Sequence, residues 1–131
     1  MKGLDTNIIV RFFVEDDPVQ FRRAGELFSS LSAENSAFIS LVAMAEFVWV
    51  LRAIYQVSKN EIVGFLERLA GSSGFTLENH GEVVDAIGRF ARGKADFADY
   101  LIEASGRRAG CDETLTFDVL AARSTGMRLL R

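Results

Sequence analysis

The sequence is poor in the residues on which several common kinds of chemistry depend. Cys111 is the only cysteine and His80 the only histidine among 131 residues. One cysteine cannot form an intrachain disulfide, and a zinc site built from several cysteine or histidine ligands is likewise excluded. A ribonuclease that uses two histidines as acid and base is excluded for the same reason. A GxGxxG phosphate-binding motif is also absent, and the one GxxxxGK spacing, at residues 88–94, is not followed by the Ser or Thr that completes a P-loop.

The chain also lacks an excess of positive charge and a long, uninterrupted apolar run. Lys and Arg total 15 against 18 Asp and Glu, which argues against a broad basic surface for nucleic acid but leaves a local basic groove open. The most apolar stretch, residues 37–55, carries Glu46 and Arg52, whereas a membrane span needs about 20 mostly apolar residues. Asp5 and Asn7 interrupt the apolar core that a signal peptide would need. We therefore expect a cytoplasmic protein without membrane contact.

The apolar residues that are present, 49% of the chain, follow strand spacing in some segments and helix spacing in others. Short strands are predicted over residues 2–5, 37–40, 75–77, 113–117 and 127–130, and helices over most of the segments between them. Pro18 stands at a helix start, Ser40 and Ser58 are expected to cap helices, and Gly93 and Gly110 to end them. Strands that alternate with helices predict a parallel sheet covered on both faces, in a single domain over residues 1–131.

Acidic residues follow the ends of two predicted strands and begin the helix between them. Asp5 follows the first strand, Asp118 follows the fourth, and Asp96 and Asp99 begin the helix that leads to the fourth. Ligands of parallel α/β sheets bind beyond the carboxyl ends of the strands, so these acids are expected at one edge. Taken alone, Asp5 is explained as well by helix capping as by a binding site. Asp96 and Asp99 fit the N-cap and N3 positions of a helix, and for that pair alone capping is the slightly better explanation. Beside the other acids, Asp99 is better explained by a nearby cation.

Glu46 stands in a predicted helix that is apolar around nearly its whole circumference. We expect it to be buried and therefore to need a cation, the alternative being that it faces water through a gap. Four or five carboxylates that converge on one cleft repel one another. A hard cation such as Mg²⁺ or Mn²⁺ would offset that repulsion.

Four features together resemble the PIN-domain ribonucleases, and specifically the VapC toxins of toxin–antitoxin pairs. They are LDTN at residues 4–7, Glu46 within its apolar helix, ADFADYLIEA at residues 95–104 and TLTFD at residues 114–118. The resemblance covers nearly the whole chain. It implies a three-layer α/β/α sandwich around a central parallel sheet of four or five short strands. It also implies Mg²⁺- or Mn²⁺-dependent cleavage of RNA, a homodimer, and inhibition by a VapB-type antitoxin through which any contact with DNA would be made.

The resemblance also implies which residues form the site. The metal-binding and catalytic acids fall on Asp5, Glu46, Asp99 and Asp118, of which the last is the more variable in the family. Many relatives place a non-acid at Asp96, which would be a helix cap and an outer metal contact. The polar residues that support the acids correspond to Thr6, Asn7 and Thr116. As contacts to RNA phosphates we select the basic residues Arg11, Arg89, Arg92 and Lys94.

Two other interpretations remain open from the sequence. A PIN-like domain that binds RNA or protein without cleaving would share the fold, because fold alone does not establish activity. An aspartyl-phosphate hydrolase also places an aspartate after its first strand, but Asn7 stands where its second aspartate is expected. The aromatic residues Phe12, Phe13, Trp49 and Tyr55 fit either a dimer contact or the core.

Overall fold

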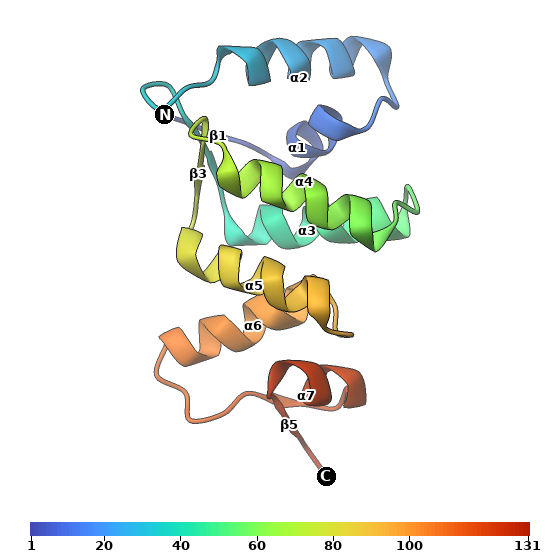
Figure 1. Cartoon of the computed structure of the whole chain (residues 1–131), viewed down its shortest axis with the longest axis vertical. Coiled ribbons are helices and arrows are strands. Elements are labelled where there is room, and N and C mark those ends of the chain that lie inside the picture. The colour runs from blue at the N-terminus through green and yellow to red at the C-terminus, as the bar shows by residue number, and fades with distance from the viewer. The chain divides into compact units, whose positions relative to one another are not determined.

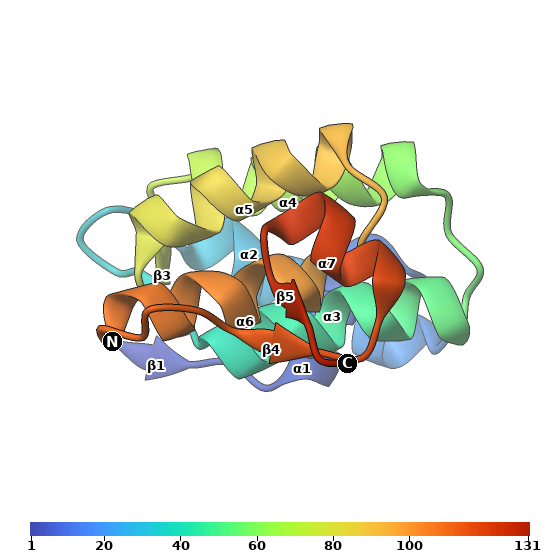
Figure 2. The same ribbon diagram turned by 90° about the horizontal axis from the view of Figure 1, so that it is seen from below.

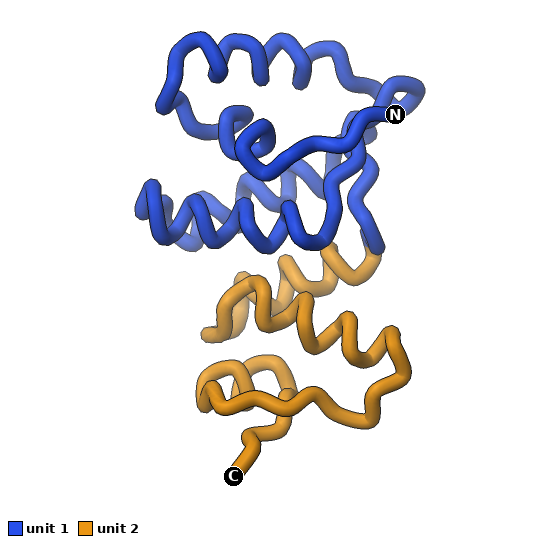
Figure 3. Tube along the Cα trace, turned by 180° about the vertical axis from the view of Figure 1, so that it is seen from behind, with its two compact units in different colours: residues 1–80 blue, residues 81–131 orange.

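The computed structural model describes residues 1–131 and divides into two compact units, residues 1–80 and residues 81–131 (Figure 3). Each unit has its own helices and its own parallel strands, three in the first unit and two in the second. The single domain expected over the whole chain stays a prediction. None of the helices combines the length and the apolar content that crossing a membrane requires.

The first unit contains a parallel sheet of three strands and four helices (Figure 1). In spatial order the strands are β1 (Lys2–Gly3), β2 (Ala37–Ile39) and β3 (Phe75–Leu77). The register pairs Lys2 with Ala37 and Phe38 with Thr76. The helices are α1 (Thr6–Phe13), α2 (Pro18–Ser30), α3 (Leu41–Ala53) and α4 (Lys59–Gly71).

The starts of these helices follow local capping chemistry. Pro18 lies in the first turn of α2, and the Asp17 carboxylate accepts hydrogen bonds from two backbone N–H groups of that turn. The hydroxyls of Ser40 and Ser58 accept a backbone N–H at the starts of α3 and α4. The expected helix starts at Pro18, Ser40 and Ser58 are thus confirmed.

Aromatic packing joins α1 to the rest of the first unit. The Phe12 ring packs edge-on against Phe28 of α2, with 5.4 Å between ring centroids. The Phe13 ring stacks on Phe65 of α4 at 4.4 Å. Both phenylalanines therefore pack within the unit, whereas the Trp49 side chain is exposed on α3. This packing fixes α1, and with it the residues at the helix start, against α2 and α4.

The second unit contains α5 (His80–Arg92), which begins at the last residue of the first unit, and α6 (Phe97–Arg108). After them come β4 (Leu115–Thr116), α7 (Val119–Thr125) and β5 (Arg128–Leu129). Strands β4 and β5 pair in parallel and lie against α7 (Figure 2). Gly126 ends α7 with φ of 89°, a left-handed conformation that glycine adopts without strain.

The α/β class with parallel strands is confirmed, but the strands are arranged differently from the prediction. Instead of one sheet, the five strands form a three-stranded and a two-stranded sheet. The segment 113–117, which alternates like a strand, forms a strand only at residues 115–116, although the Thr114 carbonyl also accepts the Arg128 N–H. Alternation reports which side chains suit a sheet, whereas a strand also needs a partner for its backbone groups.

Candidate functional site

Two of the predicted acids, Asp5 and Glu46, line one cavity of the first unit. This Asp5 cavity measures about 300 Å³, and its lining residues are Asp5, Thr6, Asn7, Val10, Arg11, Glu46, Val50 and Tyr55. Asp5 lies just beyond β1 and caps α1, its carboxylate accepting the Thr6 backbone N–H at 2.7 Å. The Thr6 hydroxyl donates to Glu46 Oε1 at 3.1 Å. Thr6 therefore links the two acids, one through its backbone and one through its side chain.

The expectation that Glu46 is buried is wrong. Helix α3 buries Met44, Phe47 and Leu51 and turns Glu46 and Trp49 outward. Because apolar residues surround this helix almost completely, their spacing does not show which face packs inward. Glu46 therefore does not need a cation to compensate burial. Its relevance to the site comes from sharing a cavity with Asp5.

Arg11 brings a positive charge to the rim of the Asp5 cavity, but its guanidinium is held by other groups. Its Nη1 donates to the Tyr55 hydroxyl at 3.1 Å, and its Nε donates to Gln20 Oε1 at 3.1 Å. The Tyr55 hydroxyl in turn donates to Asp16 Oδ2, which lies 3.7 Å from Arg11 Nη2. Residues of α2 and of the segment after α3 thus fix Arg11 at a defined position beside the acids. Sequence reasoning missed this role of Tyr55.

In the second unit, Asp96 and Asp99 occupy the start of α6. Asp96 is the N-cap residue, and Asp99, three residues on, accepts the Asp96 backbone N–H at 3.1 Å. This is the reciprocal geometry of a capping box. Capping therefore accounts for the position of Asp99 as well as that of Asp96, and a cation is not needed to explain why an acid stands there.

The electrostatic setting of Asp99 nevertheless disfavours its charged form. Partial burial raises the pKa of the Asp99 carboxyl above its ordinary value, the hydrogen bond from the Asp96 backbone opposes this, and the negative charges of Asp96 and Asp118 raise it further. Asp118 caps α7 by accepting the Ala121 N–H at 3.0 Å. The Thr116 hydroxyl accepts the Asp118 N–H at 3.0 Å and so holds the turn between β4 and α7.

The predicted metal ligands Asp5, Glu46, Asp99 and Asp118 share one property: each accepts a hydrogen bond from a neutral backbone N–H or hydroxyl. The ion pairs of the structure use other acids, namely Asp16, Glu82, Glu103 and Glu113. Carboxylate and hydroxyl oxygens are the donors that Mg²⁺ and Mn²⁺ prefer, so the side chains present suit such an ion. Neither unit by itself gathers three or more acidic, histidine or cysteine side chains into a metal-binding group.

The basic residues predicted to contact phosphates differ in whether other protein groups already engage their side chains. Arg89 is committed to the interior of the second unit, since it donates to Glu103 Oε1 at 3.0 Å and to the Thr125 carbonyl at 2.7 Å. Arg92 and Lys94 are exposed. Sequence reasoning missed Glu103, a buried acid that also accepts from Arg107 at 2.6 Å. The i, i+4 spacing of Glu103 and Arg107 on one helix could have predicted their ion pair from the sequence.

Comparison with known proteins gives one result that covers almost the whole chain. The sequence model of the PIN domain family matches residues 3–123, a range that includes every acid of the predicted site. No curated protein matches the chain. The family match agrees with the α/β class and parallel strands of the structure, and both are consistent with a three-layer α/β/α fold. The chain therefore belongs to the PIN domain family, whose members are generally metal-dependent nucleases.

Proposed function

We propose that the protein is a Mg²⁺- or Mn²⁺-dependent endoribonuclease and the toxin of a VapBC-type toxin–antitoxin pair. Membership of the PIN domain family supports the nuclease chemistry. One observation carries the proposal. The carboxylates of the proposed site accept hydrogen bonds from uncharged backbone N–H or hydroxyl groups, namely those of Asp5, Glu46, Asp99 and Asp118, while other acids form the ion pairs. Carboxylates left without a basic partner are available to a divalent cation.

Each residue of the site has a role in this proposal. Asp5, Glu46, Asp99 and Asp118 would hold the metal, with Asp96 as an outer contact. A bound divalent ion polarises a phosphate and lowers the pKa of a bound water. Thr6 holds the Glu46 carboxylate through its hydroxyl, and Asn7 lines the same cavity. Thr116 fixes the backbone at Asp118.

The proposed substrate is a single-stranded segment of RNA, because unstacked bases leave the backbone accessible. Arg11, Arg92 and Lys94 would contact its phosphates. Arg89 is left out because its guanidinium is engaged by Glu103 and Thr125. As partners we propose a VapB-type antitoxin and a second copy of the chain. The competing proposal is a PIN-like module that binds RNA or protein without cleaving it.

The substitution Asp99→Asn tests the role of this acid. It should abolish metal-dependent RNA cleavage and leave the metal-free protein at least as stable at neutral pH. Because the pKa of Asp99 is raised in the folded protein, its negative charge destabilises the fold at pH values above the ordinary pKa of 3.8. Asparagine removes that charge, while its side-chain carbonyl still accepts the Asp96 N–H. Asp112→Asn, at an exposed acid outside the proposed set, is the control and should cleave normally. Normal cleavage by the Asp99 variant would remove Asp99 from the mechanism.

Thermal unfolding with and without Mg²⁺ tests whether acids of the two units bind the same ion. At 100 times its dissociation constant a bound ion stabilises by about 2.7 kcal/mol. Either Asp5→Asn or Asp99→Asn alone should remove this stabilisation, and the double variant should lose nothing more. Losses that add between the two substitutions would indicate separate ions. A wild-type protein that Mg²⁺ does not stabilise would favour the non-cleaving module.

A further inference from the structure

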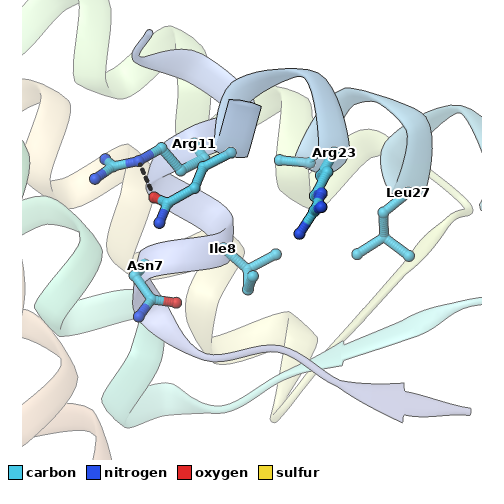
Figure 4. Close-up of a pocket in the computed structure, with 7 residues that line it drawn as sticks. Asn7, Ile8, Arg11, Arg23 and Leu27 are labelled. Carbon is cyan, nitrogen blue, oxygen red and sulfur yellow. Dashed lines mark hydrogen bonds between the residues drawn. The ribbon is translucent and has the colours of Figure 1, made fainter. Parts of the chain in front are cut away.

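A second cavity lies between α1 and α2, next to the Asp5 cavity (Figure 4). This α1–α2 cavity measures about 500 Å³ and is lined by Asn7, Ile8, Arg11, Gln20, Arg23, Ala24 and Leu27. Asn7 and Arg11 also line the Asp5 cavity. Both cavities lie within the first unit, so their adjacency is a property of that unit alone. A ligand whose reacting end lies at Asp5 can therefore extend past Arg11 into the α1–α2 cavity.

The lining of the α1–α2 cavity combines an apolar surface with two guanidinium groups. Ile8, Ala24 and Leu27 form the apolar part. Arg11 is fixed on one side by its hydrogen bond to Gln20. Arg23 points from α2 towards the cavity in Figure 4 and takes part in none of the ion pairs of the structure. The cavity therefore offers a positive charge and a planar guanidinium that no protein group engages.

We infer that the α1–α2 cavity binds the base of a nucleotide next to the cleaved bond and thereby contributes to the choice of RNA sequence. This inference rests on the proposed ribonuclease function. Unstacked RNA bases are recognised by stacking on aromatic rings or guanidinium planes and by hydrogen bonds to their edges. Arg23 supplies the plane, and the carboxamides of Asn7 and Gln20 supply donors and acceptors. The volume lies within the range of about 300–1,000 Å³ that small-ligand sites occupy.

The same lining fits a docked protein helix less well. A helix that binds in a groove places a continuous apolar stripe against it. Four of the seven lining residues of the α1–α2 cavity are polar or charged, namely Asn7, Arg11, Gln20 and Arg23. Burying the Arg23 guanidinium under an apolar face would leave a charge without a partner, which is costly. A base with its attached phosphate satisfies both the apolar and the cationic part of the cavity.

Neighbouring arginines on α2 allow a matched test. Arg22 and Arg23 are both exposed, but only Arg23 lines the cavity. Binding of short single-stranded oligoribonucleotides that differ at one position is measured by fluorescence anisotropy in EDTA. Cleavage preference is then read by sequencing the products of a randomised RNA pool in Mg²⁺.

Arg23→Ala should weaken binding of the preferred oligonucleotide roughly 5- to 30-fold, the size of a lost stacking contact, and flatten base preference on one side of the cleaved bond. Arg23→Lys keeps the charge but loses the plane, so it should also flatten the preference. Arg22→Ala should leave the preference as in the wild type.

Two outcomes would overturn the inference that the cavity binds a base, and a third would overturn the proposed ribonuclease function. Equal, sequence-independent losses for the Arg22 and Arg23 variants would indicate general attraction to phosphates and overturn the base-binding role. An Arg23 variant that binds and cleaves RNA normally but no longer binds a protein partner would make the cavity a protein-docking surface and overturn it too. If the wild type binds RNA in EDTA with a base preference that Arg23→Ala removes, but never cleaves RNA, the proposed function is refuted and the base-binding role of the cavity is supported.

Discussion

The substitution Glu103→Gln removes the charge at the centre of an ion-pair network in the second unit. Glu103 is only 8% exposed and accepts hydrogen bonds from Arg89 Nη1 at 3.0 Å and Arg107 Nε at 2.6 Å. Arg89 also donates to the Thr125 carbonyl, so the network joins α5 and α6 to the end of α7. Glutamine keeps the volume but has one acceptor oxygen, and its amide N–H groups would face one of the two guanidinium groups.

The geometry indicates which of the two bonds is lost. The Arg107 side chain is 59% exposed and the Arg89 side chain 24% exposed. The amide oxygen should stay with Arg89, because water solvates the exposed Arg107 side chain more fully than the less exposed Arg89 side chain. Hydrogen bonds to charged groups contribute about 1.5–3 kcal/mol, and exposed ion pairs about 0–1 kcal/mol. We expect Glu103→Gln to lower the free energy of unfolding by about 1–2 kcal/mol, which in a chain of this size lowers Tm by roughly 3–5 °C per kcal/mol.

The effect should depend on pH. Burial raises the pKa of Glu103, but the hydrogen bonds and positive charges of Arg107 and Arg89 outweigh it and leave the pKa below its ordinary value of 4.5. A carboxyl with a lowered pKa stabilises the fold above the unfolded-state value and loses that contribution as the pH falls through the folded-state value. The difference between wild type and variant should therefore be complete at neutral pH and shrink below pH 4.5.

Urea unfolding followed by circular dichroism, at neutral pH and at several values below 4.5, measures this difference. Arg107→Ala is the control and should cost less than about 1 kcal/mol, because that side chain is largely exposed. A Glu103→Gln protein as stable as the wild type at neutral pH would refute the reasoning. A difference that did not change with pH would show that lost packing, not the ion pairs, was responsible.

Two further substitutions probe the interior and the candidate site. A Cβ at Gly93 would clash with the Tyr100 hydroxyl oxygen, which is buried without a hydrogen-bond partner. Gly93→Ala should therefore cost about 1–3 kcal/mol, and Tyr100→Phe should recover part of that loss in thermal unfolding. A loss that Tyr100→Phe did not reduce would place the strain elsewhere. Thr6→Val removes the hydroxyl that donates to Glu46 and should slow metal-dependent RNA cleavage, whereas Thr6→Ser should retain it. Equal rates for both Thr6 variants would show that this bond does not position the carboxylate.

Local features of the fold were predictable from the sequence because they depend on residues a few positions apart. The starts of α2, α3 and α4 follow from Pro18, Ser40 and Ser58. The capping box at Asp96 and Asp99 follows from their spacing of three. The parallel pairing of the strands follows from the helices between them.

Features that depend on which face of an element packs inward were not predictable in the same way. The exposure of Glu46 is one case, because the apolar residues of α3 leave its buried face undefined. The inward commitment of Arg89 is another, since its partners Glu103 and Thr125 lie 14 and 36 positions away. An arginine in a sequence has the same formal charge whether it faces RNA or a buried acid.

The sequence by itself determined the α/β class, the order of the helices and strands, and the acids at the starts of helices. Hydrophobic periodicity and helix capping depend only on residues that are close together in the sequence. Only the tertiary structure decided that Thr6 joins Asp5 to Glu46, that Tyr55 and Gln20 fix Arg11, and that Glu103 ties three helices together. These contacts bring distant segments within hydrogen-bonding distance. Their geometry depends on how the helices pack, and a pattern along the chain does not specify that packing.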